Sequence, residues 1–265
     1  MSAAIHFEKW QALGNDFILI DQAKNPSLKL NADLARKLCD RHYGIGADQI
    51  LHLTLPMSPL ALGRMDLRNA DGETSEMCGN GIRAVALYFA EKHPGRKEIP
   101  IEVMSRVYPI TLTSKGARVD MGAPQVLNLS QSVDKISFTE VNMGNPHAVI
   151  ELDSHKDLTD LNITTLGPQI ELNSRFPNRT NVEWAWVENR KNIHMCVWER
   201  GAGVTLACGS GACAVVAAMV AEKKCDAQVS VHLPGGMLSI EWSGAQSDSV
   251  WMEGPASRVF VGEWK

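Results

Sequence analysis

The sequence predicts an α+β fold made of two similar halves, each with many short strands around one buried helix. Three observations predict this architecture: an internal repeat, a series of short alternating apolar runs, and one apolar helix in each half. At 265 residues, the chain is long enough for one large domain or two small ones.

The repeat is clearest in two Gly-rich motifs. Residues 76–92 read EMCGNGIRAVALYFAEK, and residues 206–222 read LACGSGACAVVAAMVAE. Cys78 aligns with Cys208, an offset of 208 − 78 = 130 residues, and the Gly-x-Gly that follows each cysteine also matches. Self-similarity at a fixed spacing is the mark of a duplicated unit.

The same offset links two further segments. It places Asn15 on Asn145, each preceded by glycine and followed by an apolar run, and it places Asn69 on Glu199, each at the end of an alternating run. Three separated segments in one register favour an ancestral duplication over chance.

Local patterns supply the elements of each half. Alternating runs predict strands, namely 50–55, 99–103, 117–121, 136–141, 182–187, 193–198, 229–232, 238–242 and 259–261. Residues 81–92 and 211–224 are apolar nearly all round, which predicts buried helices. An amphipathic helix with an Asn cap is expected over 31–42, and 159–170 is read as a further helix or an irregular turn.

The halves are expected to meet near residues 116–127, where Gly and Pro supply turns and no low-complexity linker is seen. The predicted domains are therefore 1–118, with Cys78, and 119–255, with Cys208.

Composition and charge narrow the classes of function. Apolar residues make up 45%, charged residues 21%, and the net charge is −4. Without a Lys/Arg cluster, nucleic acid and anionic membranes are not expected partners. The first 17 residues lack the apolar core of a signal peptide, and no apolar run reaches the ~18 residues of a spanning helix. The expected location is the cytoplasm, where thiols stay reduced.

The six cysteines contain no CxxC pair, so their spacing does not predict a zinc site. Four of them are read as small buried hydrophobic residues: Cys39, Cys196, Cys213 and Cys225.

Cys78 and Cys208 differ because each stands at the start of a predicted helix. Helix N-termini carry unpaired N–H groups and a partial positive charge. A thiol there is expected to have its pKa lowered from the free value of ~8.5, and the same N–H groups can hold a carboxylate. Facing each other across a cleft, a thiolate could remove a Cα proton and a thiol could deliver one.

Three other interpretations of these cysteine motifs are open from the residues alone. Residues 79–84 and 209–214 match G-x-G-x-x-A, a dinucleotide-binding pattern, but no acidic residue at a strand end follows either. A cysteine hydrolase with His147 as base would leave one cysteine unused. The Gly-rich turns could also serve packing alone.

At these residues the sequence resembles the diaminopimelate epimerase family. Residues 69–83, NADGETSEMCGNGIR, look like its first cysteine motif, and 199–214, ERGAGVTLACGSGACA, like its second. LGNDFILID, GADQ, MGNPH and TNVEW resemble further family blocks. The similarity covers nearly the whole chain.

The resemblance implies the fold and the reaction. The fold would be two pseudo-symmetric halves, each a mixed β-sheet wrapped around a central helix, with the C-terminal strand (about 256–265) returning to the first half. The reaction would interconvert LL- and meso-2,6-diaminopimelate without pyridoxal phosphate, metal or other cofactor, for lysine and peptidoglycan precursor synthesis. A homodimer is expected because homodimers occur in the family.

The resemblance also implies residue roles. Cys78 and Cys208 would be the two catalytic bases; Glu199 would accept from the α-ammonium and tune Cys208, and His147 would tune the other thiol. The expected substrate-binding residues are Asn15, Gln49, Asn69, Gly79, Asn80, Asn145, Asn181, Arg200, Gly209 and Ser210. Arg200 suits a distal carboxylate, which it could bind through two hydrogen bonds.

Two alternatives remain at this point. One is a racemase of proline, hydroxyproline or histidine on the same fold, which would have little need of Arg200. The other is a non-catalytic amino-acid-binding module, against which the two retained cysteines argue. Val204 stands where the family commonly has an acidic residue, which leaves room for an altered substrate.

Overall fold

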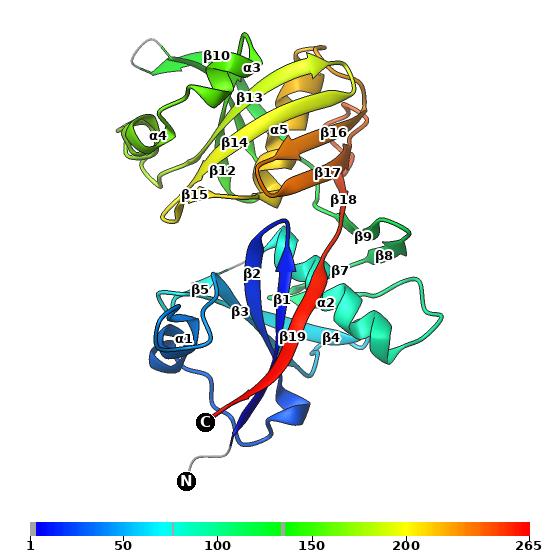
Figure 1. Ribbon diagram of the computed structural model, residues 1–265. Coiled ribbons are helices and arrows are strands. Elements are labelled where there is room, and N and C mark those ends of the chain that lie inside the picture. Colours follow the sequence, from blue (N-terminus) through cyan, green and yellow to red (C-terminus); the bar gives the residue numbers. More distant parts are fainter. Residues whose placement is uncertain (1–3, 76, 134–135) are drawn as a thin grey trace. The chain divides into compact units, whose positions relative to one another are not determined.

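The computed structural model describes residues 4–75, 77–133 and 136–265, so Glu76 of the first cysteine motif lies outside the described residues. The chain divides into two compact units (Figure 1): unit 1 is Met1–Val119 with Gly254–Lys265, and unit 2 is Asp120–Glu253. Both units are rich in strands and poor in helices, which confirms the predicted α+β class.

Unit 1 is built around one mixed sheet with the order β19-β1-β2-β3-β4-β6-β7. The β2–β3 and β4–β6 pairs are parallel and the other neighbours are antiparallel. The last strand of the chain therefore pairs with the first. The elements are β1 (Ile5–Ala12), β2 (Asn15–Asp21), η1 (Gln22–Lys24), α1 (Ala32–Cys39), β3 (Gln49–Thr54), β4 (Gly63–Asn69), β5 (Thr74–Ser75), α2 (Gly79–Lys92), β6 (Ile101–Val103), β7 (Arg106–Tyr108), β8 (Ile110–Thr113), β9 (Gly116–Asp120) and β19 (Ser257–Trp264).

Unit 2 repeats this plan in the order β10-β11-β12-β13-β14-β16-β17-β18. Its β12–β13 and β14–β16 pairs are parallel, as are the equivalent pairs of unit 1. The strand β10 takes the place that β19 takes in unit 1. The elements are β10 (Gln125–Val133), β11 (Ile136–Asn142), β12 (Pro146–Leu152), α3 (His155–Thr159), α4 (Ile163–Glu171), β13 (Asn181–Asn189), β14 (Asn192–Glu199), β15 (Gly203–Thr205), α5 (Gly209–Ala221), β16 (Gln228–Leu233), β17 (Gly236–Glu241) and β18 (Trp251–Gly254).

In each unit the sheet curves around one helix (Figure 1), α2 in unit 1 and α5 in unit 2. The first ten residues of α5 are buried except Ser210, because small Ala, Val and Gly side chains let the strands approach closely. The helix α2 is buried through its first two turns, but it ends in Glu91 and Lys92, which are exposed. The N-terminal part of each central helix therefore lies in the core of its unit.

The predicted elements agree with the structure in kind and differ at their ends. The segment 159–170, read as one helix or an irregular turn, corresponds to the short helix α4, and a second short helix, α3, ends at its first residue, Thr159. The helix expected over 31–42 spans Ala32–Cys39, with Asn31 as its N-cap: the Asn31 side chain accepts from the Leu34 amide at 2.9 Å. Among the described residues, no helix combines the length and apolar character that crossing a membrane requires.

The register of the repeat shifts by two residues in one strand. In the parallel pair β2–β3, Phe17 lies opposite Gln49, and in the parallel pair β12–β13, His147 lies opposite Asn181. The first residues of these pairs differ by 147 − 17 = 130 and the second by 181 − 49 = 132. The uniform offset of 130 therefore does not hold along β3 and β13.

Candidate active site

Cys78 is the N-cap residue of α2, so its side chain meets the free amides of the first helical turn. Its backbone is extended, with φ −130° and ψ 109°, and its sulfur accepts from the Gly81 amide at 3.3 Å. The thiol also lies 3.7 Å from Asn15 Oδ1, to which it can donate. Cys78 is half-buried, so a ligand can reach the sulfur.

Cys208 occupies the equivalent place at the start of α5. Its φ and ψ are −119° and 113°, and its sulfur accepts from the Gly211 amide at 3.4 Å. The Ser210 hydroxyl lies 3.6 Å from the sulfur. Cys208 is only 6% exposed, so the second thiol lies in a drier environment.

The first turn of each helix forms a cradle of backbone amides. Gly79 and Asn80 begin α2, and Gly209 and Ser210 begin α5. The first N–H groups of a helix have no partner within the helix, and the third of each turn is taken by the cysteine sulfur. The remaining amides, together with the positive end of the helix dipole, suit a carboxylate.

The expectation of a lowered thiol pKa is wrong for Cys208. Burial, followed by the negative charges of Glu199 and Glu183, raises the pKa of the Cys208 thiol well above its usual range, although hydrogen bonds from Ser210 and Gly211 act in the opposite direction. Loss of hydration of the thiolate outweighs the helix terminus here. The resting form of Cys208 is therefore the protonated thiol.

Glu199 lies beside this thiol at the end of β14. Burial raises the pKa of the Glu199 carboxyl, while Thr205, whose hydroxyl donates to Oε1, and the Cys208 thiol lower it. Glu199 and Arg200 are adjacent in sequence but have separate environments: Glu199 is bonded to Thr205, and Arg200 is exposed.

Predicted binding residues gather near Cys78 within unit 1. The Asn80 side chain donates to Asn15 Oδ1 at 3.4 Å, and the Gln49 side chain donates to Asn69 Oδ1 at 2.9 Å. Gln49 and Asn69 lie opposite each other in β3 and β4. The Oε1 atom of Gln49 is buried without a hydrogen-bond partner among the described residues.

A second group lies within unit 2. Asn181 Nδ2 donates to the Pro146 carbonyl at 2.9 Å, and its Oδ1 accepts from the Arg200 backbone amide at 2.9 Å. The Arg200 guanidinium donates to the Asn178 carbonyl at 3.3 Å and remains exposed. Asn181 thus fixes the backbone at Arg200 and leaves most of the guanidinium free to bind a carboxylate.

His147 lies in the same unit as Cys208 and is fully buried. Its Nδ1 is 2.7 Å from Glu183 Oε1, and its Nε2 is 2.9 Å from Asn145 Oδ1. Sequence reasoning missed Glu183 altogether. The available signal was a carboxylate in the middle of the apolar run VEWAWV, since a buried charge requires a partner.

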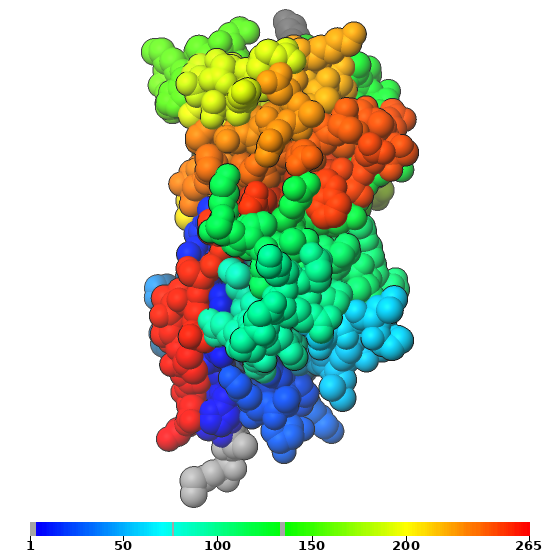
Figure 2. Space-filling model, turned by 90° about the vertical axis from the view of Figure 1, so that its right-hand side faces the viewer, coloured from blue at the N-terminus to red at the C-terminus, as the bar shows by residue number. Residues whose placement is uncertain are grey.

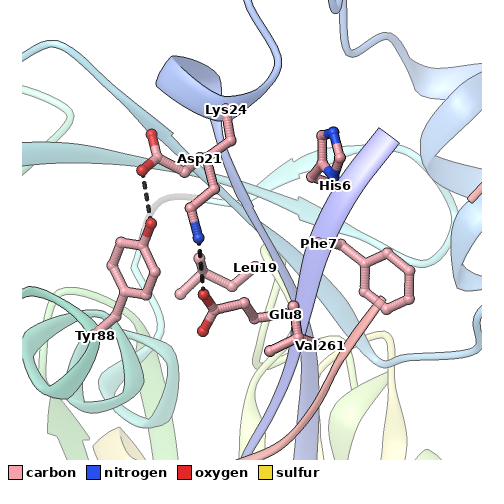
Figure 3. A pocket seen from close by; sticks show the side chains of 8 residues that line it. All are labelled: His6, Phe7, Glu8, Leu19, Asp21, Lys24, Tyr88 and Val261. Atoms are coloured by element: carbon pink, nitrogen blue, oxygen red, sulfur yellow. Dashed lines mark hydrogen bonds and ion pairs between the residues drawn. The ribbon is translucent and has the colours of Figure 1, made fainter. Parts of the chain in front are cut away.

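Other features of the chain do not add to this site. A cavity of about 340 Å³ in unit 1 (Figure 3) contains none of the predicted site residues. Its ionic side chains are already paired, Lys24 with Glu8 at 3.1 Å and Tyr88 with Asp21 at 2.6 Å. Among the described residues, no three His, Cys, Asp or Glu side chains are grouped so that they could hold a metal ion.

Each unit therefore supplies the same chemical set: a cysteine at a helix N-terminus, the backbone amides of the first helical turn behind it and an asparagine beside it. A cysteine can exchange a proton with a carbon acid, and the amides can stabilise negative charge on an adjacent carboxylate.

The sequence is also similar to known proteins over nearly its whole length. The family model "Diaminopimelate epimerase" matches residues 7–127 and 139–259. A curated diaminopimelate epimerase from Carboxydothermus hydrogenoformans is 43% identical over 98% of this chain and 99% of its own length. Its counterpart from Rippkaea orientalis is 42% identical over 98% of both chains.

Solved structures share the fold at lower identity. A PhzF-family phenazine biosynthesis protein from Bacillus anthracis superposes with a TM-score of 0.76 at 14% identity, covering 99% of both chains. A hydroxyproline epimerase from Agrobacterium vitis gives a TM-score of 0.75 at 12% identity, covering 99% of this chain and 91% of its own.

Proposed function

The chain belongs to the diaminopimelate epimerase family, and we propose that it interconverts LL- and meso-2,6-diaminopimelate through Cys78 and Cys208. One observation carries the assignment of the two bases: both residues are N-cap cysteines whose sulfurs accept an amide hydrogen from the residue three positions on. The product would serve lysine and peptidoglycan precursor synthesis.

The proposed reaction is a proton exchange at one Cα. One sulfur, as thiolate, takes the Cα proton and becomes a thiol, leaving a carbanion conjugated with the adjacent carboxylate. The other sulfur, as thiol, delivers its proton to the opposite face and becomes the thiolate. The roles reverse in the other direction, as microscopic reversibility requires. No cofactor is needed, because the helix amides carry the developing charge.

The surrounding residues have roles that follow from their donors and acceptors. The amides of Gly79, Asn80, Gly209 and Ser210 would hold the reacting carboxylate. Glu199 would accept from the α-ammonium and modulate Cys208, and Arg200 would bind the distal carboxylate. His147 would tune the other thiol, and the remaining polar groups would orient the substrate: Asn15, Gln49, Asn69, Asn145 and Asn181.

Solvent exchange tests the proposal. In D₂O, the wild-type protein is expected to incorporate deuterium at Cα of LL-diaminopimelate while forming the meso isomer. Cys78→Ala and Cys208→Ala should abolish both, whereas Cys225→Ala, which removes a buried thiol outside the site, should leave both unchanged. Normal turnover in either of the first two variants would refute the two-base assignment. Faster exchange with proline, hydroxyproline or histidine would instead identify a racemase of that amino acid.

The proposal extends to assembly and location. The strand β19 lies at the edge of the unit 1 sheet and on its surface (Figure 2), and Val259, Phe260 and Val261 are 58%, 47% and 62% exposed. An uncovered apolar edge strand is a surface for pairing, so we assign it to a homodimer. Sedimentation equilibrium should give a dimer mass, and Phe260→Lys should shift it to the monomer. Six free cysteines suit the reducing cytoplasm.

A further inference from the structure

The carboxylate of Glu183 is fully buried beneath the first turn of α5. Its Oε1 is 2.7 Å from His147 Nδ1, and its Oε2 has no hydrogen-bond partner among the described residues. A Cβ atom added at Gly211 would lie 2.7 Å from Glu183 Oε1 and 3.3 Å from the Cys208 sulfur. The carboxylate therefore lies directly under the cysteine-bearing turn.

Unit 1 has an apolar side chain in the equivalent place. A Cβ atom added at Gly81 would lie 2.8 Å from Leu51 Cδ2 and 3.6 Å from the Cys78 sulfur. The offset of 132 in this strand also relates Leu51 to Glu183, and the offset of 130 relates Phe17 to His147. The side chain below the Cys78 turn is thus apolar, Leu51, and the one below the Cys208 turn is a carboxylate, Glu183. The register-equivalent residues on the neighbouring strands are Phe17 in unit 1 and His147 in unit 2.

The side-chain amide of Asn145 lies between Ser210 and His147. Its Nδ2 lies 3.4 Å from Ser210 Oγ, and its Oδ1 accepts from His147 Nε2, so this nitrogen carries a hydrogen. The other ring nitrogen then either donates to the Glu183 carboxylate or accepts from its carboxyl group. In both cases the Glu183 carboxyl group is the hydrogen-bond partner of Nδ1, and Nε2–H is the group that faces Asn145.

Unit 1 uses a different carboxylate for its asparagine. Asp48 Oδ2 accepts from Asn15 Nδ2 at 2.8 Å, so Oδ1 of Asn15 is turned to the Cys78 thiol. The residue equivalent to Asp48 in unit 2 is Thr180, whose hydroxyl donates to the backbone of Asn181. In each unit a different residue therefore orients the asparagine side chain. Asp48 turns the oxygen of Asn15 toward Cys78, whereas His147 turns the nitrogen of Asn145 toward Ser210.

We propose that Glu183 is a positioning residue that, through His147, holds Asn145 with its N–H toward Ser210, so that the two cysteines face unlike hydrogen-bonding groups. Ser210 Oγ accepts from Asn145 and lies 3.6 Å from the Cys208 sulfur, to which its own hydrogen can be donated. On the side of its asparagine, Cys78 therefore faces an acceptor, Asn15 Oδ1, whereas Cys208 faces a hydroxyl donor in addition to its acceptor Glu199. This relay, from His147 through Asn145 and Ser210, offsets part of the cost of forming a thiolate at the buried sulfur.

The inference rests on the proposed function for its effect on turnover, but thiol alkylation tests it without substrate. In Glu183→Leu, which removes the hydrogen-bond partner of His147 Nδ1, the rate at which iodoacetamide alkylates Cys208, followed by mass spectrometry at pH 8, is expected to fall at least fivefold. The rate at Cys78 in the same molecule should stay within twofold. We expect kcat for diaminopimelate to fall roughly tenfold or more with little change in KM, as when an orienting partner of a catalytic histidine is lost.

A matched control and two contrary results keep the test decisive. Glu102→Gln removes another buried carboxylate, bonded to Arg64 and the Met57 amide, and should alter neither alkylation rate nor kcat. Unchanged or faster alkylation of Cys208 in Glu183→Leu would show that Glu183 acts by charge alone, and it would overturn the relay. A wild-type protein without epimerase activity but with the predicted alkylation contrast would refute only the proposed function.

Discussion

Asn15 and Asn145 occupy equivalent positions in the two halves but present opposite ends of their amides to the cysteines. Oδ1 of Asn15 lies 3.7 Å from the Cys78 sulfur, whereas Oδ1 of Asn145 lies 2.9 Å from His147 Nε2 and its Nδ2 faces Ser210. A two-base reaction needs one thiol and one thiolate at a time. A duplicated protein therefore benefits when its halves differ at these positions.

Replacing the glycine at the third position of each central helix with alanine should reduce turnover more when the change is in unit 2 (Gly211) than in unit 1 (Gly81). In Gly211→Ala the new Cβ would displace Glu183, which His147 holds in place. We expect a loss in kcat of roughly tenfold or more, by the same loss of orientation. In Gly81→Ala the contact is with Leu51 Cδ2, the end of a side chain that can rotate. Steady-state kinetics of both variants check this contrast, and equal losses would contradict it.

Replacing only Glu183 of the buried His147–Glu183 pair should lower the stability of the fold, whereas replacing both residues with apolar ones should cost little. Glu183→Leu leaves His147 Nδ1 without its hydrogen-bond partner in a dry site, which should lower the free energy of unfolding by about 1–3 kcal/mol. His147→Phe/Glu183→Leu copies the Phe17 and Leu51 support of unit 1 and should recover most of that loss. Urea unfolding measures both. The double variant should remain as inactive as the single one; recovery of kcat would show that the pair has only a packing role.

Removing the carboxylate that orients Asn15 should affect only the other cysteine. Asp48→Ala leaves Asn15 Nδ2 without its acceptor, so the amide can rotate and the Cys78 thiol loses a fixed acceptor. A thiol without an acceptor forms its thiolate more readily, so alkylation of Cys78 should rise roughly threefold. Cys208 provides the internal control. A change at both cysteines would indicate general loosening of the fold.

Acid should weaken unit 1 through Asp16. Burial alone would raise the pKa of the Asp16 carboxyl, but hydrogen bonds from Arg41 and Lys9 hold it well below its ordinary range. A carboxyl whose pKa is depressed by folding stabilises the folded state above the unfolded pKa of about 3.9, and the contribution disappears as the pH falls further.

Asp16→Asn should therefore lower the unfolding free energy at pH 7 by about 2 kcal/mol, a figure reduced for solvent screening. The difference from wild type should narrow as the pH is lowered below about 4. Thermal unfolding at several pH values measures it. A difference that is the same at pH 7 and pH 3 would show that the Asp16 charge does not stabilise the fold.

The parts predictable from sequence are those with local signals. The helix starts at Cys78 and Cys208 follow from Gly-rich turns before apolar runs, and the strands around Ile50 and Ile193 follow from alternation. The β7–β8 segment was not foreseen, since its strands are only three and four residues long, too short for an alternating pattern to stand out, although each pairs with a neighbouring strand of the chain.

The candidate site was predictable where it repeats and hidden where it does not. The pairs Cys78/Cys208 and Asn15/Asn145 share the offset of 130, so the repeat exposes them. Glu183 follows a different offset, and a uniform alignment places it on Leu53 rather than Leu51. Its role depends on a register that the folded sheet sets and on a contact with Gly211 across the unit.

The pairing of β19 with β1 has a consequence for biosynthesis. Ile5 lies opposite Trp264, so the sheet of unit 1 gains its outermost strand only when the segment that follows unit 2 has been synthesised. Unit 2, by contrast, is a continuous stretch of polypeptide, Asp120–Glu253, and needs no later segment to complete it. The half that emerges first is thus the last to be completed.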